Sequence, residues 1–207
     1  VGGNPVYVAL ADINKDGKTD IITANGNTNN VTILINETDN NSLTPVFSSR
    51  YDFNTGNRPV AVAIADINND SWPDIVTSNY YGESISVLLN VTEPGSAVPA
   101  FSEKTDLPVG TAPIELSLPD INGDGKADIA TANINTNKIT VYINKTDSGA
   151  AVPSFGEKTE FNTGTNPTSL SSADINGDKK PDLLTSNFSS QSVTVLINTT
   201  AAGSDVP

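Results

Sequence analysis

The 207-residue chain contains no cysteine, no methionine and no histidine, and aromatic residues make up only 6% of it. Without cysteine it has no disulfides, no thiolate nucleophile and no zinc–thiolate site. Without histidine it lacks the base of Ser-His-Asp catalysis and the usual proton carrier near neutral pH. A catalyst built on this sequence would depend on carboxylates or on a bound metal ion. The sequence therefore predicts that the protein is not an enzyme.

Positive charge is also scarce, because 11 Lys and Arg stand against 24 Asp and Glu, a net charge of −13. Proteins that bind nucleic acids obtain most of their affinity from a basic face, so we expect no nucleic-acid partner. No apolar run approaches the length of about 18 residues that a membrane-spanning helix needs. We therefore expect no membrane span. The excess acid is typical of either a solvated surface or a set of cation sites, and the positions of the acids decide between them.

A nine-residue acidic segment recurs four times at a constant spacing. Its copies read DINKDGKTD, DINNDSWPD, DINGDGKAD and DINGDKKPD, and they begin at Asp12, Asp66, Asp120 and Asp174. The repeat length is therefore 54 residues. Four repeats fill the chain, at approximately 1–54, 55–108, 109–162 and 163–207. This regularity predicts a single domain, 1–207, or a segment of one, rather than two separate domains.

Each repeat predicts four short strands and no helix. The first strand begins at the proline before each acidic loop, and the second directly follows the loop. The third is an alternating β-branched run such as VTILIN from Val31, and the fourth is a more polar run such as FSSRYDF from Phe47, which suits the outer edge of a sheet. Repeats of this kind are typical of β-propeller blades, whereas the alternative, a solenoid of stacked β-coils, usually has shorter repeats. The predicted fold is an all-β propeller of four-stranded antiparallel blades, either a four-blade ring or a segment of a larger propeller or assembly.

Oxygen-bearing side chains occupy positions one, three, five and nine of every acidic loop. In chain order they are Asp12, Asn14, Asp16, Asp20; Asp66, Asn68, Asp70, Asp74; Asp120, Asn122, Asp124, Asp128; and Asp174, Asn176, Asp178, Asp182. The residues at position seven, each expected to offer a main-chain carbonyl, are Lys18, Trp72, Lys126 and Lys180. Ca²⁺ binds about six to eight hard oxygen ligands, which such a loop supplies. Asp–Asn runs also form turns, but four matching copies favour calcium, and we expect up to four Ca²⁺ ions, one per repeat.

The loops are not EF-hands, because position twelve is a threonine inside a predicted strand and no flanking helices are predicted. Position six of each loop needs a sharp turn that favours glycine, which is present as Gly17 and Gly125. Ser71 and Lys179 replace it in the second and fourth loops. We therefore expect these two loops to bind calcium more weakly or to use a different turn.

The ADINxDxxxD-type segment, the [ILV]TxN strand that follows it and the VxVLIN strand together resemble the FG-GAP/VCBS repeats of integrin α-subunits and bacterial surface proteins. The resemblance covers nearly the whole chain. It implies a calcium-binding propeller in which loop positions one, three, five and nine ligate the metal. It also implies an extracellular or cell-surface protein that serves adhesion, scaffolding or lectin-like recognition. The blade number departs from the pattern, because propellers of this family commonly have seven blades and this chain has about four.

The sequence leaves three functional classes to compare. The first, which we predict, is an extracellular structural or adhesion module that associates with other proteins or with copies of itself. The alternative is a lectin-like module that binds glycans through Tyr80, Tyr81 and Phe188, with Arg58 nearby, although these rings also suit the covering of a blade edge. For the third, an enzyme on a propeller scaffold, no catalytic constellation is found outside the acidic loops.

Two further patterns accompany the repeats. Asn-x-Thr follows each third strand, at Asn36, Asn90, Asn144 and Asn198. These triplets are either N-glycosylation acceptors or turn-forming residues copied with the repeat. The last repeat also lacks a fourth strand, so the edge formed by 193–198 is expected to be unpaired. We expect a longer chain or a neighbouring copy to supply the missing strand, and copies joined head to tail would form a ring or a filament.

Overall fold

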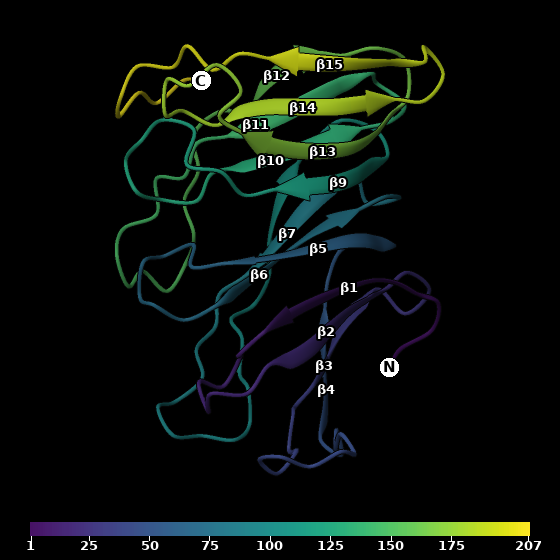
Figure 1. Ribbon diagram of the computed structural model, residues 1–207, viewed down its shortest axis with the longest axis vertical. Helices are drawn as coiled ribbons and strands as arrows, with labels where there is room; N and C mark the ends of the chain where they lie inside the picture. Colours follow the sequence, from purple (N-terminus) through teal and green to yellow (C-terminus); the bar gives the residue numbers. More distant parts are fainter.

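The computed structural model describes residues 1–207 and contains fifteen strands and no helix (Figure 1). The first blade consists of β1 (Pro5–Ala11), β2 (Asp20–Asn25), β3 (Asn30–Leu34) and β4 (Arg50–Asn54). The second consists of β5 (Pro59–Ala65), β6 (Asp74–Asn79), β7 (Ser84–Leu88) and β8 (Thr105–Pro108). The third consists of β9 (Pro113–Ser117), β10 (Ile129–Asn133), β11 (Lys138–Tyr142) and β12 (Thr159–Asn162). The fourth has only β13 (Pro167–Ala173), β14 (Asp182–Asn187) and β15 (Ser192–Leu196). No helix that could cross a membrane is found in the structure.

Within each blade the strands follow chain order and every pairing is antiparallel. Consecutive strands are joined by short connections, so the simplest antiparallel order forms. The fourth strands begin later than the polar runs that predicted them. β4 begins at Arg50 rather than at Phe47, and β8 and β12 begin at Thr105 and Thr159 rather than at the equivalent phenylalanines, Phe101 and Phe155. Phe101 and Phe155 form only isolated bridges, to Asn90 and Asn144.

The first strand of each blade is the innermost, and the polar fourth strand lies at the outer edge as the sequence predicts. β1 lies against β5, β5 against β9, and β9 against β13, so the blades follow one another around an axis. The first and last blades lie at opposite ends of the molecule, and the sheets do not close into a ring (Figure 1). The predicted all-β propeller of antiparallel blades is thus confirmed, in the form of a partial propeller.

The hydrophobic cores lie between the blades. Because neighbouring residues of a strand point to opposite faces, each blade has two apolar faces. We call them the A face and the B face. In the first blade, the A face is formed by Ile13, Val31, Ile33 and Ile35. In the second blade, the B face is formed by Val62, Ile75 and Leu88, and these two sets pack together as one buried cluster. Equivalent clusters join the second blade to the third and the third to the fourth.

Candidate functional site

The acidic loops connect the first and second strands of the blades, and their main chain is folded around the aspartate at position one. In the first loop the Asp12 carboxylate accepts hydrogen bonds from the N–H of Asp16 at 3.0 Å and of Gly17 at 2.9 Å. The same two bonds recur in the other three loops. Asn14 donates to Asp16 at 3.4 Å, so the loop brings the side chains at positions one, three and five together.

The aspartate at position nine anchors each loop to its blade. Asp20 is fully buried, and it accepts the N–H of Ile13 at 2.9 Å and of Asn36 at 2.8 Å. Its counterparts make the same pair of bonds, to the residue at position two and to the asparagine that follows the third strand. This second role, in tying the loop to the end of the third strand, was not evident from the sequence.

Burial changes the acidity of these anchoring groups. Desolvation, aided by the charges of Asp70 and Asp66, raises the pKa of Asp74 to about 7. Desolvation, aided by the two other carboxylates of its own loop, raises the pKa of Asp128 to about 6. Burial also raises the pKa of Asp20. The pKa of Asp182 is lowered by the N–H groups of Asn198 and Ile175. In the first three loops the charged form of the aspartate at position nine is therefore poorly solvated, and a nearby cation would favour it.

Positions four and six of every loop adopt the left-handed backbone conformation. At position six the φ angles are 86° for Gly17, 72° for Ser71, 84° for Gly125 and 69° for Lys179, so all four loops use one turn. At position four they are 57° for Lys15, 51° for Asn69, 70° for Gly123 and 81° for Gly177. Side chains disfavour this conformation. The third loop has glycine at both positions, the first and fourth at one, and the second at neither.

The loop residues suit Ca²⁺ by their chemistry, because their donors are oxygens only. The side-chain oxygen of Asn68, at position three of the second loop, is buried and has no hydrogen-bond partner. No group of three or more carboxylates gathers closely enough in the structure to hold a metal ion. The carboxylates instead face the N–H groups of their own loop. At position seven the N–H groups of Lys18, Trp72, Lys126 and Lys180 donate to the aspartate at position five.

The Asn-x-Thr triplets form a hydrogen-bonded staple between blades. The side chain of Asn144 donates to the carbonyls of Ala127 in its own blade, at 3.0 Å, and of Ile67 in the previous blade, at 2.8 Å. Its oxygen accepts the N–H of Thr146, which is the turn that the sequence suggests. Asn90 and Asn198 make the same set of bonds. Asn36 has no previous blade and donates only to Thr19, at 3.0 Å.

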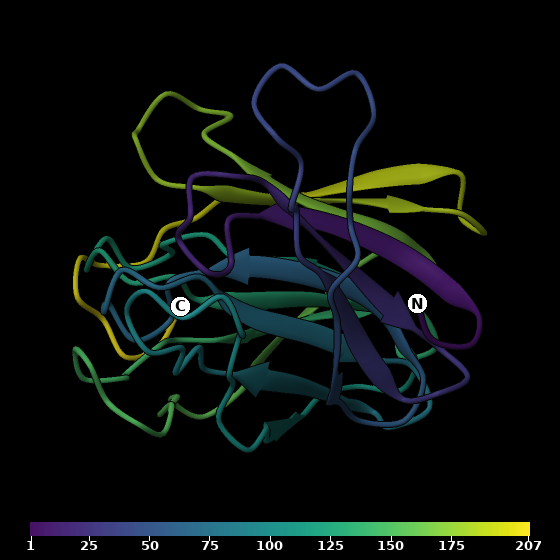
Figure 2. The same ribbon diagram turned by 90° about the horizontal axis from the view of Figure 1, so that it is seen from below.

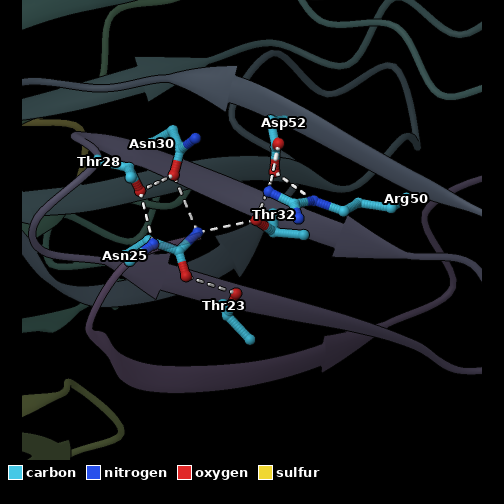
Figure 3. Close-up of polar contacts among 8 residues, drawn as sticks. Thr23, Asn25, Thr28, Asn30, Thr32, Arg50 and Asp52 are labelled. Carbon is cyan, nitrogen blue, oxygen red and sulfur yellow. Dashed lines mark hydrogen bonds and ion pairs between the residues drawn. The ribbon is translucent and has the colours of Figure 1, made fainter. Parts of the chain in front are cut away.

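A second repeated network lies on the B face of each blade. In the first blade Asn25 donates to Asn30 at 3.0 Å and to Thr32 at 2.9 Å, and Thr32 donates to Asp52 (Figure 3). Asn79, Asn133 and Asn187 occupy the same position in the other blades and reach the equivalent hydroxyl. The constant asparagine of the [ILV]TxN pattern is therefore explained by a buried polar link between second and third strands.

The aromatic turns on the opposite end of the blades are only partly available. The guanidinium of Arg58 lies 4.7 Å from the ring centre of Tyr81 and 5.6 Å from that of Tyr80, and it donates to the Tyr81 hydroxyl at 2.8 Å. Arg58 thus occupies space beside the two rings that were candidates for sugar stacking, and Tyr81 is still 60% exposed. Phe188 is 77% exposed but lies on the last blade, away from this cluster.

The family model described as FG-GAP-like repeat matches residues 2–77 and 120–185, which is more than half of the chain. The chain belongs to the FG-GAP-like repeat family. Each matched segment of this FG-GAP-like protein includes at least one acidic loop and the strands on both sides of it. No curated protein sequence matches the chain.

Solved structures show the same fold at low sequence identity. BBS1N in complex with ARL6DN aligns with a TM-score of 0.55 and 11% identity over 95% of the FG-GAP-like chain. A Lactobacillus plantarum protein aligns with a TM-score of 0.50 and 13% identity over 97% of it. A Bacteroides uniformis protein, proposed to be a 6-phosphogluconolactonase, aligns with a TM-score of 0.50 and 14% identity over 96% of it. The FG-GAP-like chain spans 54–57% of the length of these chains.

Proposed function

We propose that this FG-GAP-like chain is an extracellular, calcium-stabilised structural or adhesion module that associates with other proteins or with copies of itself. The supporting observation is the repetition of one loop geometry, with the same hydrogen bonds at positions one, five and nine of all four loops. Twelve aspartates are concentrated in these loops, and their repulsion opposes folding unless it is compensated. The side chains at positions one, three, five and nine and the carbonyl at position seven would hold the ion. Bound Ca²⁺ would supply positive charge beside the buried aspartate at position nine.

An extracellular setting suits the chemistry of these loops. Several are strained by residues other than glycine in left-handed conformations, as at Asn69 and Ser71. Strained and exposed loops are expected to bind weakly, and calcium modules that work outside cells bind in the range of about 10⁻⁴–10⁻³ M. Cysteine is absent, so disulfides do not provide stability, and bound metal ions are the remaining means of cross-linking the turns. We also propose that the chain has no catalytic activity, and turnover of a substrate that survives substitution of all four loops would contradict this.

Thermal melting tests the proposal. The midpoint is expected to fall when calcium is removed with EGTA and to recover when calcium is restored, and calorimetric titration is expected to detect no more than four ions. Asp124→Asn should reduce the calcium-dependent part of the stability, because it removes a charge from the least strained loop. Asp147→Asn is the matched control, since Asp147 is an exposed acid in a connector outside the loops. An unchanged midpoint in EGTA would contradict the calcium role.

Glycan binding is a second candidate, and one groove favours it. At the junctions of the second and third blades, and of the third and fourth, the main chain of the acidic loop bonds to the neighbouring connector, as Gly149 N–H does to the Asn68 carbonyl at 2.7 Å. No such bond joins the first and second blades. A groove of about 340 Å³ lies there instead, lined by Asn14, Lys15, Asp16, Trp72 and residues 94–97.

Trp72 gives this groove an aromatic platform beside amide and carboxylate oxygens, a combination that suits a sugar ring. The Lys15 ammonium lies 4.3 Å from the indole ring centre, and a ligand would replace it there. Trp72 is the single tryptophan, so its fluorescence reports on the groove alone. Fluorescence titration of the wild type with glycans selected on an array tests this candidate, with Tyr81→Ala as the control. Trp72→Ala, which lacks the fluorophore, should lose binding on the array itself. No change in emission with any array-positive glycan would remove it.

A further inference from the structure

Four apolar positions of the A face are buried in three blades and exposed in the last. Ile13, Ile67 and Ile121 are at most 4% exposed, whereas the equivalent Ile175 is 52% exposed. Val31, Ile85 and Ile139 are fully buried, whereas Val193 is 65% exposed. Val195 and Ile197 show the same change, with exposures of 44% and 47%. The A face of the fourth blade is therefore a core surface without its partner.

The B face of the first blade shows the complementary change. Val8 is 58% exposed, whereas the equivalent Val62, Leu116 and Leu170 are exposed by 3%, 7% and 6%. Leu10 and Val6 on the same strand, β1, are also exposed, by 64% and 43%. A shallow groove on this surface is lined by Pro5, Val6, Tyr7, Val8 and Thr23. In the three internal junctions an A face of the preceding blade fills this position.

The two polar partners of a junction, the asparagine after a third strand and the acidic loop that accepts its hydrogen bond, are likewise found at opposite ends of the chain. Each internal junction has an asparagine staple that reaches back to an acidic loop, as Asn198 reaches the carbonyl of Ile121 at 2.8 Å. At the first blade Asn36 has no loop to reach, and the connector between β3 and β4 stands out from the body (Figure 2). At the fourth blade the loop that would receive such an asparagine, around Ile175 and Asn176, is exposed.

We propose that a second copy of this chain covers these surfaces, with the A face of one fourth blade packed on the B face of another first blade. The inference rests on the self-association included in the proposed function, and it names the surfaces. The chain itself forms this junction three times, with the same apolar positions and staples, so a copy presents a surface that already matches. The contact is heterologous, because unlike faces meet, and successive copies would form a ring or a filament. An unrelated partner is distinguished from a second copy by the test, because only a second copy makes the mass of the purified chain rise with concentration.

Two complementary variants test the direction of the contact. Val8→Arg places a charge on the B face and Val195→Arg places one on the A face. Because both positions are exposed in the single chain, neither change should lower the melting midpoint of the monomer. Glu103→Arg is the control, since Glu103 is exposed and belongs to the internal second blade, away from both terminal faces. Analytical ultracentrifugation in saturating calcium measures the mass of each protein alone and of mixtures.

The wild type and Glu103→Arg are expected to show a mass that rises with concentration, and each face variant alone should be monomeric. An equimolar mixture of Val8→Arg and Val195→Arg should form a one-to-one dimer that grows no further, because one intact A face meets one intact B face. A wild type that stays monomeric at all concentrations would overturn the proposal, as would a face variant that still assembles alone. Melting of the same samples in EGTA tests the calcium role separately. Failure of the self-association proposal therefore leaves the calcium proposal tested, and the reverse also holds.

Discussion

The left-handed backbone conformation at loop positions four and six costs conformational free energy, and the cost is larger for other residues than for glycine. The sequence pointed to position six, and the structure adds position four, where Lys15 and Asn69 stand in place of glycine. The second loop has no glycine at either position, and the fourth loop recovers one at Gly177. We therefore expect the third loop to bind calcium most tightly and the second most weakly, with the first and fourth between them.

Glycine at position six should stabilise the two strained loops. Ser71→Gly and Lys179→Gly are each expected to raise the free energy of unfolding by roughly 0.5–1 kcal/mol, because relief of left-handed strain exceeds the entropy that glycine adds to the unfolded chain. Urea denaturation measures the gain. Lys179→Ala is the control for loss of the lysine charge, since alanine keeps the strain and should give no gain. A loss of stability in both glycine variants would show that strain at position six is unimportant.

Glu115 on β9 carries a testable pH dependence. Burial raises its pKa more than the N–H of Leu116 and the hydroxyl of Tyr7 lower it. The folded protein therefore holds this proton more tightly than the unfolded chain, and stability falls as the pH rises above the unfolded value of 4.5. Glu115→Gln should raise the melting midpoint at neutral pH and leave it nearly unchanged below the unfolded pKa. Glu103→Gln, at an exposed position, is the control. If Glu115→Gln shifted the melting midpoint equally at both pH values, the raised pKa would not be its cause.

At the scale of the structural element, the asparagine after each third strand links two blades. Asn144→Ala leaves the carbonyls of Ile67 and Ala127 and the N–H of Thr146 without partners in a buried place. Each such buried group costs about 1–3 kcal/mol, so a large loss of stability is expected. Asn36→Ala, which has one main-chain acceptor and no neighbouring blade, is the internal control and should cost much less. Similar losses for the two variants in urea denaturation would argue against an inter-blade staple.

The elements themselves could be predicted because the repeat copies every local signal four times. The alternation in β3 and the proline that begins β1 predicted the strands, and the constant spacing predicted the blades. The start of the fourth strand was placed too early in β8 and β12, because Phe101 and Phe155 have strand-like side chains but leave the ladder after a single bridge. The inter-blade staples could not be predicted, since they join residues 77 positions apart and depend on the packing of blades.

At the scale of the whole molecule, the dependence of the melting midpoint on salt distinguishes specific calcium binding from general screening of the negative charge. The net charge of −13 predicts that sodium chloride will stabilise the calcium-free protein, because salt weakens repulsion between carboxylates. Millimolar calcium should raise the melting midpoint much more than an equal ionic strength of sodium chloride, and magnesium should act less well because it resists losing its waters. Equal midpoints in the three salts would mean that the loops respond to ionic strength and hold no ion of their own.

The location of the cores between blades has a consequence for how such genes change. A blade has no interior of its own, and each of its faces matches any neighbour drawn from the same repeat. Unequal recombination that inserts or deletes one 54-residue unit therefore joins an A face to a B face without any compensating mutation. Blade number can then drift by whole units while point changes at Val62 or Ile67 remain restricted. In this architecture, gain or loss of a whole blade preserves the contacts between blades, whereas a single substitution in a core disturbs them.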